Sequence, residues 1–229
     1  MLDQLRQEVL EANLELARRG LVLYTFGNAS GISRDQELVV IKPSGVPYDR
    51  LSAADLVVTG LDGKIVEGNL RPSSDLPTHL AIYRAFPAVG GVVHTHSTHA
   101  TAWAQARREV PCLGTTHADD FRGPIPVTAE LTPPEIDADY EWNIGQAIAR
   151  RFQGLNPLEI PAILVAGHGP FVWGATPAAA AHNAVILEEI ARIAAITLAV
   201  NPQAPELNCA WRDRHFLRKH GANATYGQK

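Results

Sequence analysis

Residues 91–97 read Gly-Val-Val-His-Thr-His-Ser, an apolar run that ends in two histidines two positions apart. The apolar half predicts a buried β-strand. Because successive side chains of a strand point to opposite faces, His94 and His96 project from the same face. Two imidazoles at that spacing can bind one metal ion, although strand histidines also fill half-buried positions with ordinary hydrogen bonds.

Two further candidate ligands lie on either side of this stretch. His168 stands between two glycines just after an apolar run, where tight backbone turns expose a side chain at a strand end. Asp75 stands at the head of a predicted helix, where it would otherwise act as an N-cap. Three nitrogens and at most one carboxylate favour Zn²⁺, with Mn²⁺ or another divalent ion also possible, and indicate Lewis-acid catalysis. The remaining histidines, at 79, 99, 117, 182, 215 and 220, are expected to be ordinary surface or core residues.

Three short polar turns favour a small anionic ligand. They are Gly27-Asn28, Lys42-Pro43-Ser44-Gly45 and Pro72-Ser73-Ser74-Asp75, each at the end of a strand or the start of a helix. Backbone N–H groups, hydroxyls and one ammonium are typical of phosphate sites. Each turn alone is an ordinary turn, but the third runs directly into Asp75. The pattern therefore predicts a phosphate close to the candidate metal site.

The rest of the chain predicts one α/β domain with a mixed sheet. Helices are expected over 2–16, from 76 to Phe86, over 98–107, from Thr132 to about 152, and over 177–200. Strands are expected over 21–24, 37–42, 56–59, 64–67, 91–97, 160–166 and 170–173, with a Gly/Asn/Ser turn over 27–31. The chain beyond residue 201 is polar and lacks periodicity.

Composition excludes several classes of protein. The 229 residues carry 20 Lys+Arg and 24 Asp+Glu, a net charge of −4 with no basic stripe, which argues against nucleic acid as a partner. Charged residues inside the apolar stretch 177–200 exclude a membrane span, and the N-terminus is not a secretory signal. Two cysteines form no disulfide framework. We therefore expect a cytoplasmic protein with no membrane partner.

Seven ordered motifs resemble a known family. They are GNAS (27–30), KPSG (42–45), PSSDLPTH (72–79), VHTHS (93–97), TTHADDF (115–121), AGHGPF (166–171) and RKHGANATYGQ (218–228). Together they resemble the L-ribulose-5-phosphate 4-epimerases of the class II sugar-phosphate aldolase/epimerase family, over nearly the whole chain.

The resemblance implies a role for each matching position. His94, His96 and His168 match zinc ligands, with Asp75 as a possible fourth. The residues that match the phosphate and substrate pocket are Gly27, Asn28, Lys42, Ser44, Gly45, Ser73 and Ser74. Asp119 matches one acid/base, and Tyr226 matches the other, reaching from a neighbouring subunit. Thr115, Glu141 and His215 fall at positions in or near the site.

The resemblance also implies a fold, an assembly and a reaction. The fold is a single three-layer α/β/α domain over residues 1–229, with a largely antiparallel sheet and a C-terminal tail (about 212–229) at a subunit interface. The assembly is a homotetramer with shared active sites. The reaction interconverts L-ribulose 5-phosphate and D-xylulose 5-phosphate, phosphorylated ketopentoses of carbohydrate metabolism, by cleavage and re-formation of the C3–C4 bond.

Other functions remain open at this point. One is an aldolase of the L-fuculose- or L-rhamnulose-phosphate type, although the L-fuculose type carries glutamate where this chain has Asp75. A dehydratase would share the metal site but would not need Asp119 and Tyr226 together. A non-catalytic module like the adducin head would have lost the metal ligands, which this chain retains. Asp120 and Thr225 depart from the aromatic residues that epimerases commonly have there, and Asp120 places a second carboxylate beside Asp119.

Overall fold

The computed structural model describes residues 2–226 and contains one seven-stranded sheet with helices on both faces. The strands are β1 (Asn28–Ser33), β2 (Leu38–Ile41), β3 (Val57–Gly60), β4 (Ile65–Glu67), β5 (Gly91–His94), β6 (Ala162–Leu164) and β7 (Pro170–Gly174). The helices are α1 (Leu2–Arg18), α2 (Leu76–Ala85), α3 (Thr98–Gln105), α4 (Thr115–Ala118), α5 (Pro133–Asp137), α6 (Tyr140–Arg151), α7 (Pro177–Val200) and α8 (Cys209–His220), with a 3₁₀ turn η1 (Ala53–Asp55).

The strand order is β4-β3-β2-β1-β5-β7-β6, and every pair of these strands is antiparallel. β1 pairs with β5 so that Asn28 lies opposite His94, and β5 pairs with β7 so that His94 lies opposite Phe171. This register brings one end of each of the strands β1, β5 and β7 together at the same end of the sheet. The predicted metal-binding motif therefore meets the predicted phosphate motif GNAS.

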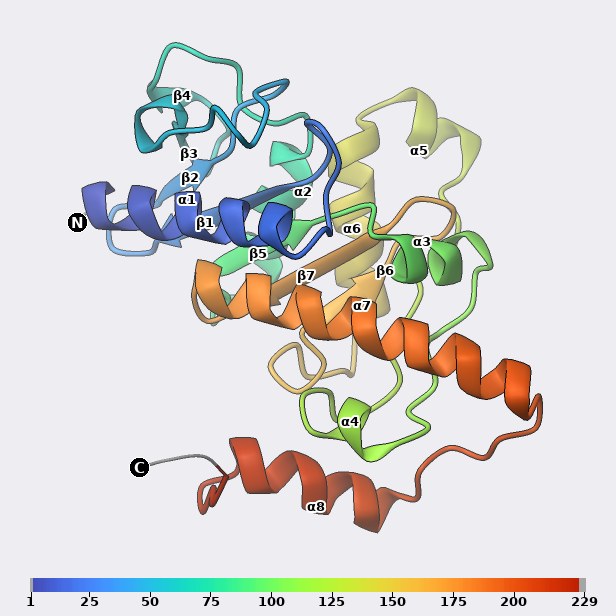
Figure 1. Cartoon of the computed structure of the whole chain (residues 1–229). Coiled ribbons are helices and arrows are strands. Elements are labelled where there is room, and N and C mark those ends of the chain that lie inside the picture. The colour runs from blue at the N-terminus through green and yellow to red at the C-terminus, as the bar shows by residue number, and fades with distance from the viewer. Residues whose placement is uncertain (1, 227–229) are drawn as a thin grey trace.

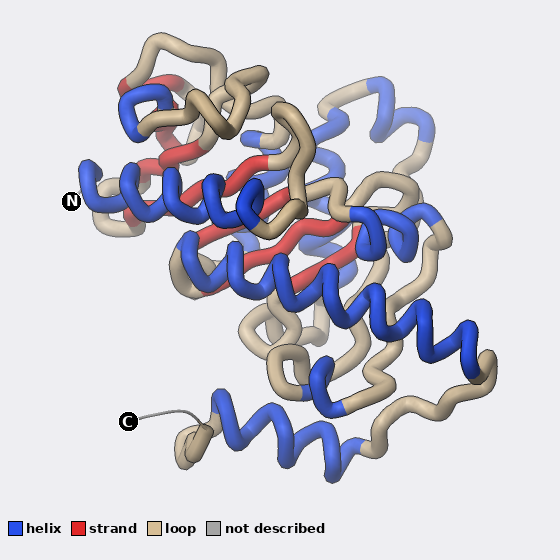
Figure 2. The backbone as a smooth tube through the Cα atoms, in the orientation of Figure 1, coloured by secondary structure: helices blue, strands red, loops and turns tan. Residues whose placement is uncertain are grey.

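α1 and α7 cover one face of the sheet, and α2 and α6 lie behind it (Figure 1). The tube in Figure 2 shows the same three layers, with the red strands between blue helices. This arrangement confirms the predicted three-layer α/β/α fold. None of the helices within residues 2–226 combines the length and the apolar character that crossing a bilayer requires.

Two predictions near the start of the sheet were wrong. The stretch 21–24 is not a strand: residues 21–23 are irregular and lead into a turn at 24–25, where Tyr24 has a φ of +53° and Phe26 N–H donates to Leu23 O. The stretch 27–31, predicted as a turn, is mostly the central strand β1. Its small residues are needed for packing, since a Cβ on Gly31 would lie 2.8 Å from both Leu5 and Pro177.

Two further predictions failed later in the chain. The helix expected from Thr132 to about 152 is broken at 138–139 into α5 and α6, although the Thr132 capping box is present. The tail contains the helix α8, which has no apolar stripe because Phe216 is its one buried residue. The strands expected over 56–59 and 64–67 are present as the antiparallel pair β3 and β4, and the helix α2 and the long helix α7 are confirmed.

Candidate functional site

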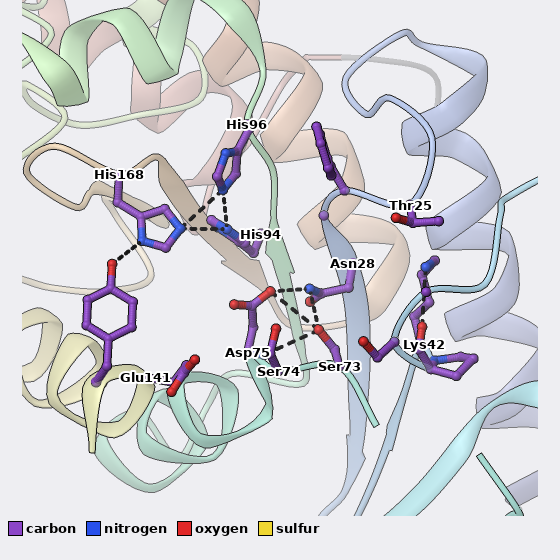
Figure 3. Close-up of a pocket in the computed structure, with 16 residues that line it drawn as sticks. Thr25, Asn28, Lys42, Ser73, Ser74, Asp75, His94, His96, Glu141 and His168 are labelled. Atoms are coloured by element: carbon purple, nitrogen blue, oxygen red, sulfur yellow. Dashed lines mark hydrogen bonds between the residues drawn. The ribbon is translucent and has the colours of Figure 1, made fainter. Parts of the chain in front are cut away.

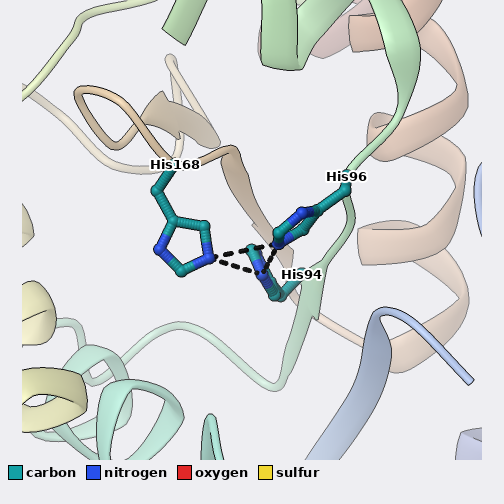
Figure 4. Close-up of side chains that lie close together, drawn as sticks. All are labelled: His94, His96 and His168. Carbon is teal, nitrogen blue, oxygen red and sulfur yellow. Dashed lines mark hydrogen bonds between the residues drawn. The ribbon is translucent and has the colours of Figure 1, made fainter. Parts of the chain in front are cut away.

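The side chains of His94, His96 and His168 converge at the end of β5 and the loop before β7 (Figure 4). The Nε2 atoms of His94 and His96 lie 3.0 Å apart, and His168 Nε2 lies 3.2 Å from the first and 3.1 Å from the second. Ligand nitrogens about 2.0–2.1 Å from a tetrahedral zinc ion lie about 3.3 Å apart, so the triangle has the size of one face of such a site.

Contacts outside the triangle prepare His94 as a ligand. His94 Nδ1 donates to the carbonyl of Pro170 at 2.9 Å, which leaves the Nε2 lone pair free. The ring stacks on Phe171 with centroids 4.2 Å apart, so its orientation is fixed. Burial lowers the pKa of the His94 imidazole to about 3, and burial with the neighbouring His96 also lowers the pKa of His168. Both rings are therefore neutral near pH 7, as metal ligation requires. The three side chains fit a divalent metal ion.

A cavity of about 480 Å³ opens directly beside the three histidines. Figure 3 shows that Asp75, Asn28, Ser73 and Lys42 border the same space as the histidines. The cavity is lined by Thr25, Phe26, Gly27, Asn28, Lys42, Pro43, Ser44, Gly45, Ser73, Ser74, Asp75, His94, His96, Tyr140, Glu141 and His168. All seven residues of the predicted phosphate and substrate pocket are among them, and so is Glu141.

The end of the cavity away from the histidines is suited to an anion. Lys42 is 1 % exposed, and its Nζ has one hydrogen-bond acceptor within residues 2–226, the carbonyl of Pro43 at 3.3 Å. The ammonium also lies 4.8 Å from the ring centroid of Tyr48. Burial lowers its pKa to about 8, so it is mostly charged at pH 7. The hydroxyls of Ser44, Ser73 and Ser74 border the same cavity.

Asp75 occupies the N-cap position of α2, but its side chain does not cap the helix. Its Oδ2 accepts a 2.6 Å hydrogen bond from Asn28 Nδ2, and Ser73 Oγ lies 3.4 Å away. Burial alone would raise the pKa of Asp75, but His94, His79 and the bond from Asn28 outweigh that effect and lower it. Among the described residues, the cluster of mutually close ligand atoms contains the three histidines and not Asp75.

Four predicted residues lie in a second cluster, away from the cavity lining. Asp119 follows α4 and accepts from His215 Nδ1 at 2.9 Å and from Nε and Nη2 of Arg218 at 2.9–3.1 Å. Thr115 opens α4, and Tyr226 lies with its ring 5.3 Å from the Arg218 guanidinium. Asp120 pairs with Lys219 at 3.2 Å, so the extra carboxylate has its own cation.

Sequence reasoning missed three residues that line the cavity, Thr25, Phe26 and Tyr140, and named Pro43 only as part of the turn 42–45. Tyr140 is the most consequential, because its hydroxyl lies 3.1 Å from His168 Nδ1. The available signal was its position immediately before Glu141. α6 presents both residues to the cavity because Gly145, one turn further on, lets α6 approach α2 closely: a Cβ there would lie 2.3 Å from Ala81 Cβ.

Known proteins share this architecture. YgbL from Klebsiella pneumoniae, described with three candidate activities (aldolase, epimerase and decarboxylase), is 30 % identical with a TM-score of 0.73, over 93 % of this chain and 98 % of its own. An L-fuculose-1-phosphate aldolase from Thermus thermophilus is 27 % identical with a TM-score of 0.69, over 89 % and 99 %. Another L-fuculose 1-phosphate aldolase shares the fold at 24 % identity and a TM-score of 0.78, over 93 % and 94 %.

The family model described as class II aldolase and adducin N-terminal domain matches residues 7–195, which include the three histidines and the whole cavity lining. α8 and the Asp119 partners on it lie beyond the matched range. The match spans well over half of the chain and agrees with the structural neighbours. The chain therefore belongs to the class II aldolase and adducin N-terminal domain family.

Proposed function

We propose that this chain is a metal-dependent enzyme that cleaves and re-forms a carbon–carbon bond in a phosphorylated ketose, with Zn²⁺ as its metal. The supporting observation is the joint placement of a three-histidine cluster and a buried lysine in one cavity. The three Nε2 atoms would hold the ion. When bound, the ion supplies Lewis-acid polarisation of the ketose carbonyl and stabilises the negative charge left by bond cleavage.

We further propose that the reaction is the 4-epimerisation of L-ribulose 5-phosphate to D-xylulose 5-phosphate. The hydrogen at C4 is not α to the C2 carbonyl, so its direct removal would leave an unstabilised carbanion. Cleavage of C3–C4 after removal of the C4 hydroxyl proton instead gives an aldehyde and a stabilised enediolate. Rotation of the aldehyde and re-addition invert C4, and the new C4 alkoxide takes up a proton.

The cavity residues and the acid/base candidates would have distinct roles in this reaction. Lys42 and the serine hydroxyls of the cavity would hold the phosphate while the aldehyde fragment turns, because its escape would make the enzyme an aldolase. Asp119 and Tyr226 would serve as the two acid/base groups, one on each face of the aldehyde. Glu141 borders the same cavity and is available to hydrogen-bond a substrate hydroxyl.

The setting of Asp75 favours the epimerase over an aldolase. The glutamate of the fuculose-type aldolases acts as the proton-transfer group, whereas Asp75 is one methylene shorter. Its carboxylate is fixed by the short bond from Asn28 and has a lowered pKa, so it is a poor proton donor near pH 7. Proton transfer then needs other residues, and Asp119 and Tyr226 match that need.

The position of the second cluster supports a shared site. Asp119, His215 and Tyr226 gather around α4 and α8, and none of the three lines the cavity formed by the described part of the protomer. We propose that a neighbouring subunit of a homotetramer brings acid/base groups to each cavity. The tail would then lie at a subunit interface while α8 stays packed on α4 of its own protomer.

The deciding experiment is an assay on L-ribulose 5-phosphate with added Zn²⁺, with D-xylulose 5-phosphate measured by a coupled enzyme and free dihydroxyacetone measured by trapping. Xylulose phosphate without free fragments, lost on chelation and restored by metal, is the expected result. Fragments without epimer, or cleavage of L-fuculose 1-phosphate, would establish an aldolase instead. Neither product from a metal-loaded protein would overturn the pentose-phosphate assignment.

A further inference from the structure

Tyr140 is the one phenol of the cavity lining, and it contacts a residue of the three-histidine cluster. Its hydroxyl oxygen lies 3.1 Å from His168 Nδ1, and the two rings are parallel within 2°. Within residues 2–226, His168 is the only hydrogen-bond partner of this hydroxyl. The phenol contacts Nδ1 of His168, whereas Nε2 of the same ring faces His94 and His96.

The direction of this hydrogen bond follows from the geometry of the cluster. His168 Nε2 faces the Nε2 atoms of His94 and His96 at 3.2 and 3.1 Å, so Nε2 is the ligating atom. A ligating Nε2 needs its lone pair, and a neutral imidazole then carries its proton on Nδ1. His168 Nδ1–H therefore donates to the Tyr140 oxygen in the loaded site. The phenol proton is left free to donate to another acceptor.

The backbone around Tyr140 is anchored by hydrogen bonds to two neighbouring helices. Tyr140 is the first residue of α6, and the carbonyl of Glu141 beside it accepts a hydrogen bond from Thr78 Oγ1 on α2. Asn143 in the same turn binds the carbonyls of both Asp139 and Glu135, through its N–H and its side chain respectively, at 2.8 Å. The first turn of α6 is thus fixed to α2 and α5, which holds the Tyr140 backbone where its hydroxyl reaches His168.

We propose that Tyr140 is a positioning residue for the metal ligand His168 and that, in the loaded site, its hydroxyl donates a hydrogen bond to a ligand oxygen in the cavity. The first half concerns only the chain and its metal. The second half rests on the proposed function, because it needs a bound oxygen-rich substrate. Hydrogen-bond partners of ligating histidines fix the ring orientation and tautomer and strengthen metal binding.

The test of the first half is Tyr140→Phe, which keeps the ring and removes only the oxygen. The zinc dissociation constant, measured by competition with a chromogenic chelator, should rise about tenfold. In ¹⁵N-edited NMR of the zinc-loaded wild-type protein, His168 should show a protonated Nδ1 whose proton exchanges slowly, and exchange should be faster in the variant. Tyr24→Phe is the matched control, because Tyr24 is 85 % exposed and does not line the cavity.

Thermal unfolding of the metal-free variant separates positioning from folding, and it should match the wild type because the phenyl ring is kept. A zinc dissociation constant within twofold of the wild type, with unchanged exchange at His168, would overturn the positioning role. The proposed hydrogen bond from Tyr140 to a ligand oxygen is tested by steady-state kinetics at saturating zinc. There Tyr140→Phe should lower kcat more than it changes KM. An unchanged kcat would remove the donor role, whereas a wild-type protein without any turnover would count against the proposed function and leave the zinc result standing.

Discussion

Lys42 is the residue in the cavity whose charge is least compensated. Its ammonium is buried, it has no carboxylate within ion-pair distance among residues 2–226, and its pKa is lowered to about 8. Burying an unpaired cation costs free energy, and a bound phosphate would supply the missing countercharge. An anion in the cavity should therefore raise the pKa of Lys42, and affinity for the anion should depend on the protonation of this one side chain.

The resulting prediction concerns the binding of glycerol 3-phosphate, a phosphate monoester that is doubly charged above pH 7 because its second pKa is near 6. Only protonated Lys42 attracts it, so the dissociation constant should be lowest near pH 7, where the ligand is doubly charged and Lys42 is mostly protonated, and should rise as the pH passes through 8 to 9.5. Lys42→Met should weaken binding at pH 7 by roughly tenfold or more, since a hydrogen bond to a charged group contributes about 1.5–3 kcal/mol. Isothermal titration calorimetry across pH measures both effects.

The control for this titration is the pH profile of Lys42→Met, which should be flat over the same range. A variant that loses affinity above pH 8 as steeply as the wild type would assign the pH dependence to another group. Unchanged affinity at pH 7 would place the phosphate elsewhere in the cavity.

At the scale of helices and strands, sequence reasoning succeeded where one short segment carries its own signal. The helix α7 begins at the predicted Thr176-Pro177 and ends at Val200, because capping and apolar periodicity both act locally. β1 was missed because its small residues are explained only by α1 and α7, which pack against it from distant parts of the chain. α8 was missed because its stabilising partners, Asp119 and Asp120, are about a hundred residues away.

The same division holds for the candidate site. The metal and phosphate roles stay predictions, but the histidine and turn motifs that line the cavity could be identified because short motifs preserve their local geometry. Tyr140 could not, because its contact with His168 depends on how closely α6 approaches α2. That approach is set by a glycine whose importance appears only when both helices are in place.

Gly145 therefore offers a prediction about the contact between these two helices. Gly145→Ala places a Cβ 2.3 Å from Ala81 Cβ and must push the helices apart. We expect the free energy of unfolding to fall by about 1–3 kcal/mol, as in overpacked cores, although alanine is the better helix former. Urea denaturation measures the loss.

Ala81→Gly in the same chain removes the clashing methyl group and is the matched rescue. The double variant should regain part of the lost free energy of unfolding. It should also bind zinc more tightly than Gly145→Ala alone, because Tyr140 and Glu141 return to the cavity. A double variant no more stable than Gly145→Ala alone would show that the helices are not held apart by this contact.

The C-terminal tail provides the next prediction at this scale. α8 is held on α4 by Asp119 with Arg218 and by Asp120 with Lys219, whereas the segment after Gly221 contributes Tyr226. Truncation after Gly221 keeps these ion pairs and the histidines but removes the proposed acid/base. We expect the truncated chain to bind zinc with normal stoichiometry and to lose turnover. Metal analysis measures the zinc stoichiometry, and the epimerase assay measures the turnover. Activity that survives the truncation would show that Tyr226 is assigned wrongly.

The whole molecule raises the question of how the two clusters meet. One protomer contains the cavity with the three histidines and Lys42 at the end of β5, and a separate group of acid/base candidates around α4 and α8. A ring of identical subunits can bring the second group of one copy to the cavity of the next, because a cyclic assembly places different surfaces against each other. In such an assembly, a subunit with a damaged cavity can still donate its acid/base group to an intact cavity of a neighbouring subunit.

Co-expression of two inactive variants tests this arrangement. His96→Ala should destroy the cavity of its own subunit, and Tyr226→Phe should leave the cavity intact but remove the group donated to a neighbour. If subunits mix randomly in equal amounts, about a quarter of the sites combine an intact cavity with an intact donor, so activity should return to about a quarter of the wild-type level per site. Each variant expressed alone and mixed only after purification, before subunits exchange, should stay inactive. If Tyr226 instead served its own protomer, no mixed site would be complete, and co-expressed activity would stay at the level of the separate variants because every subunit would still carry one lesion.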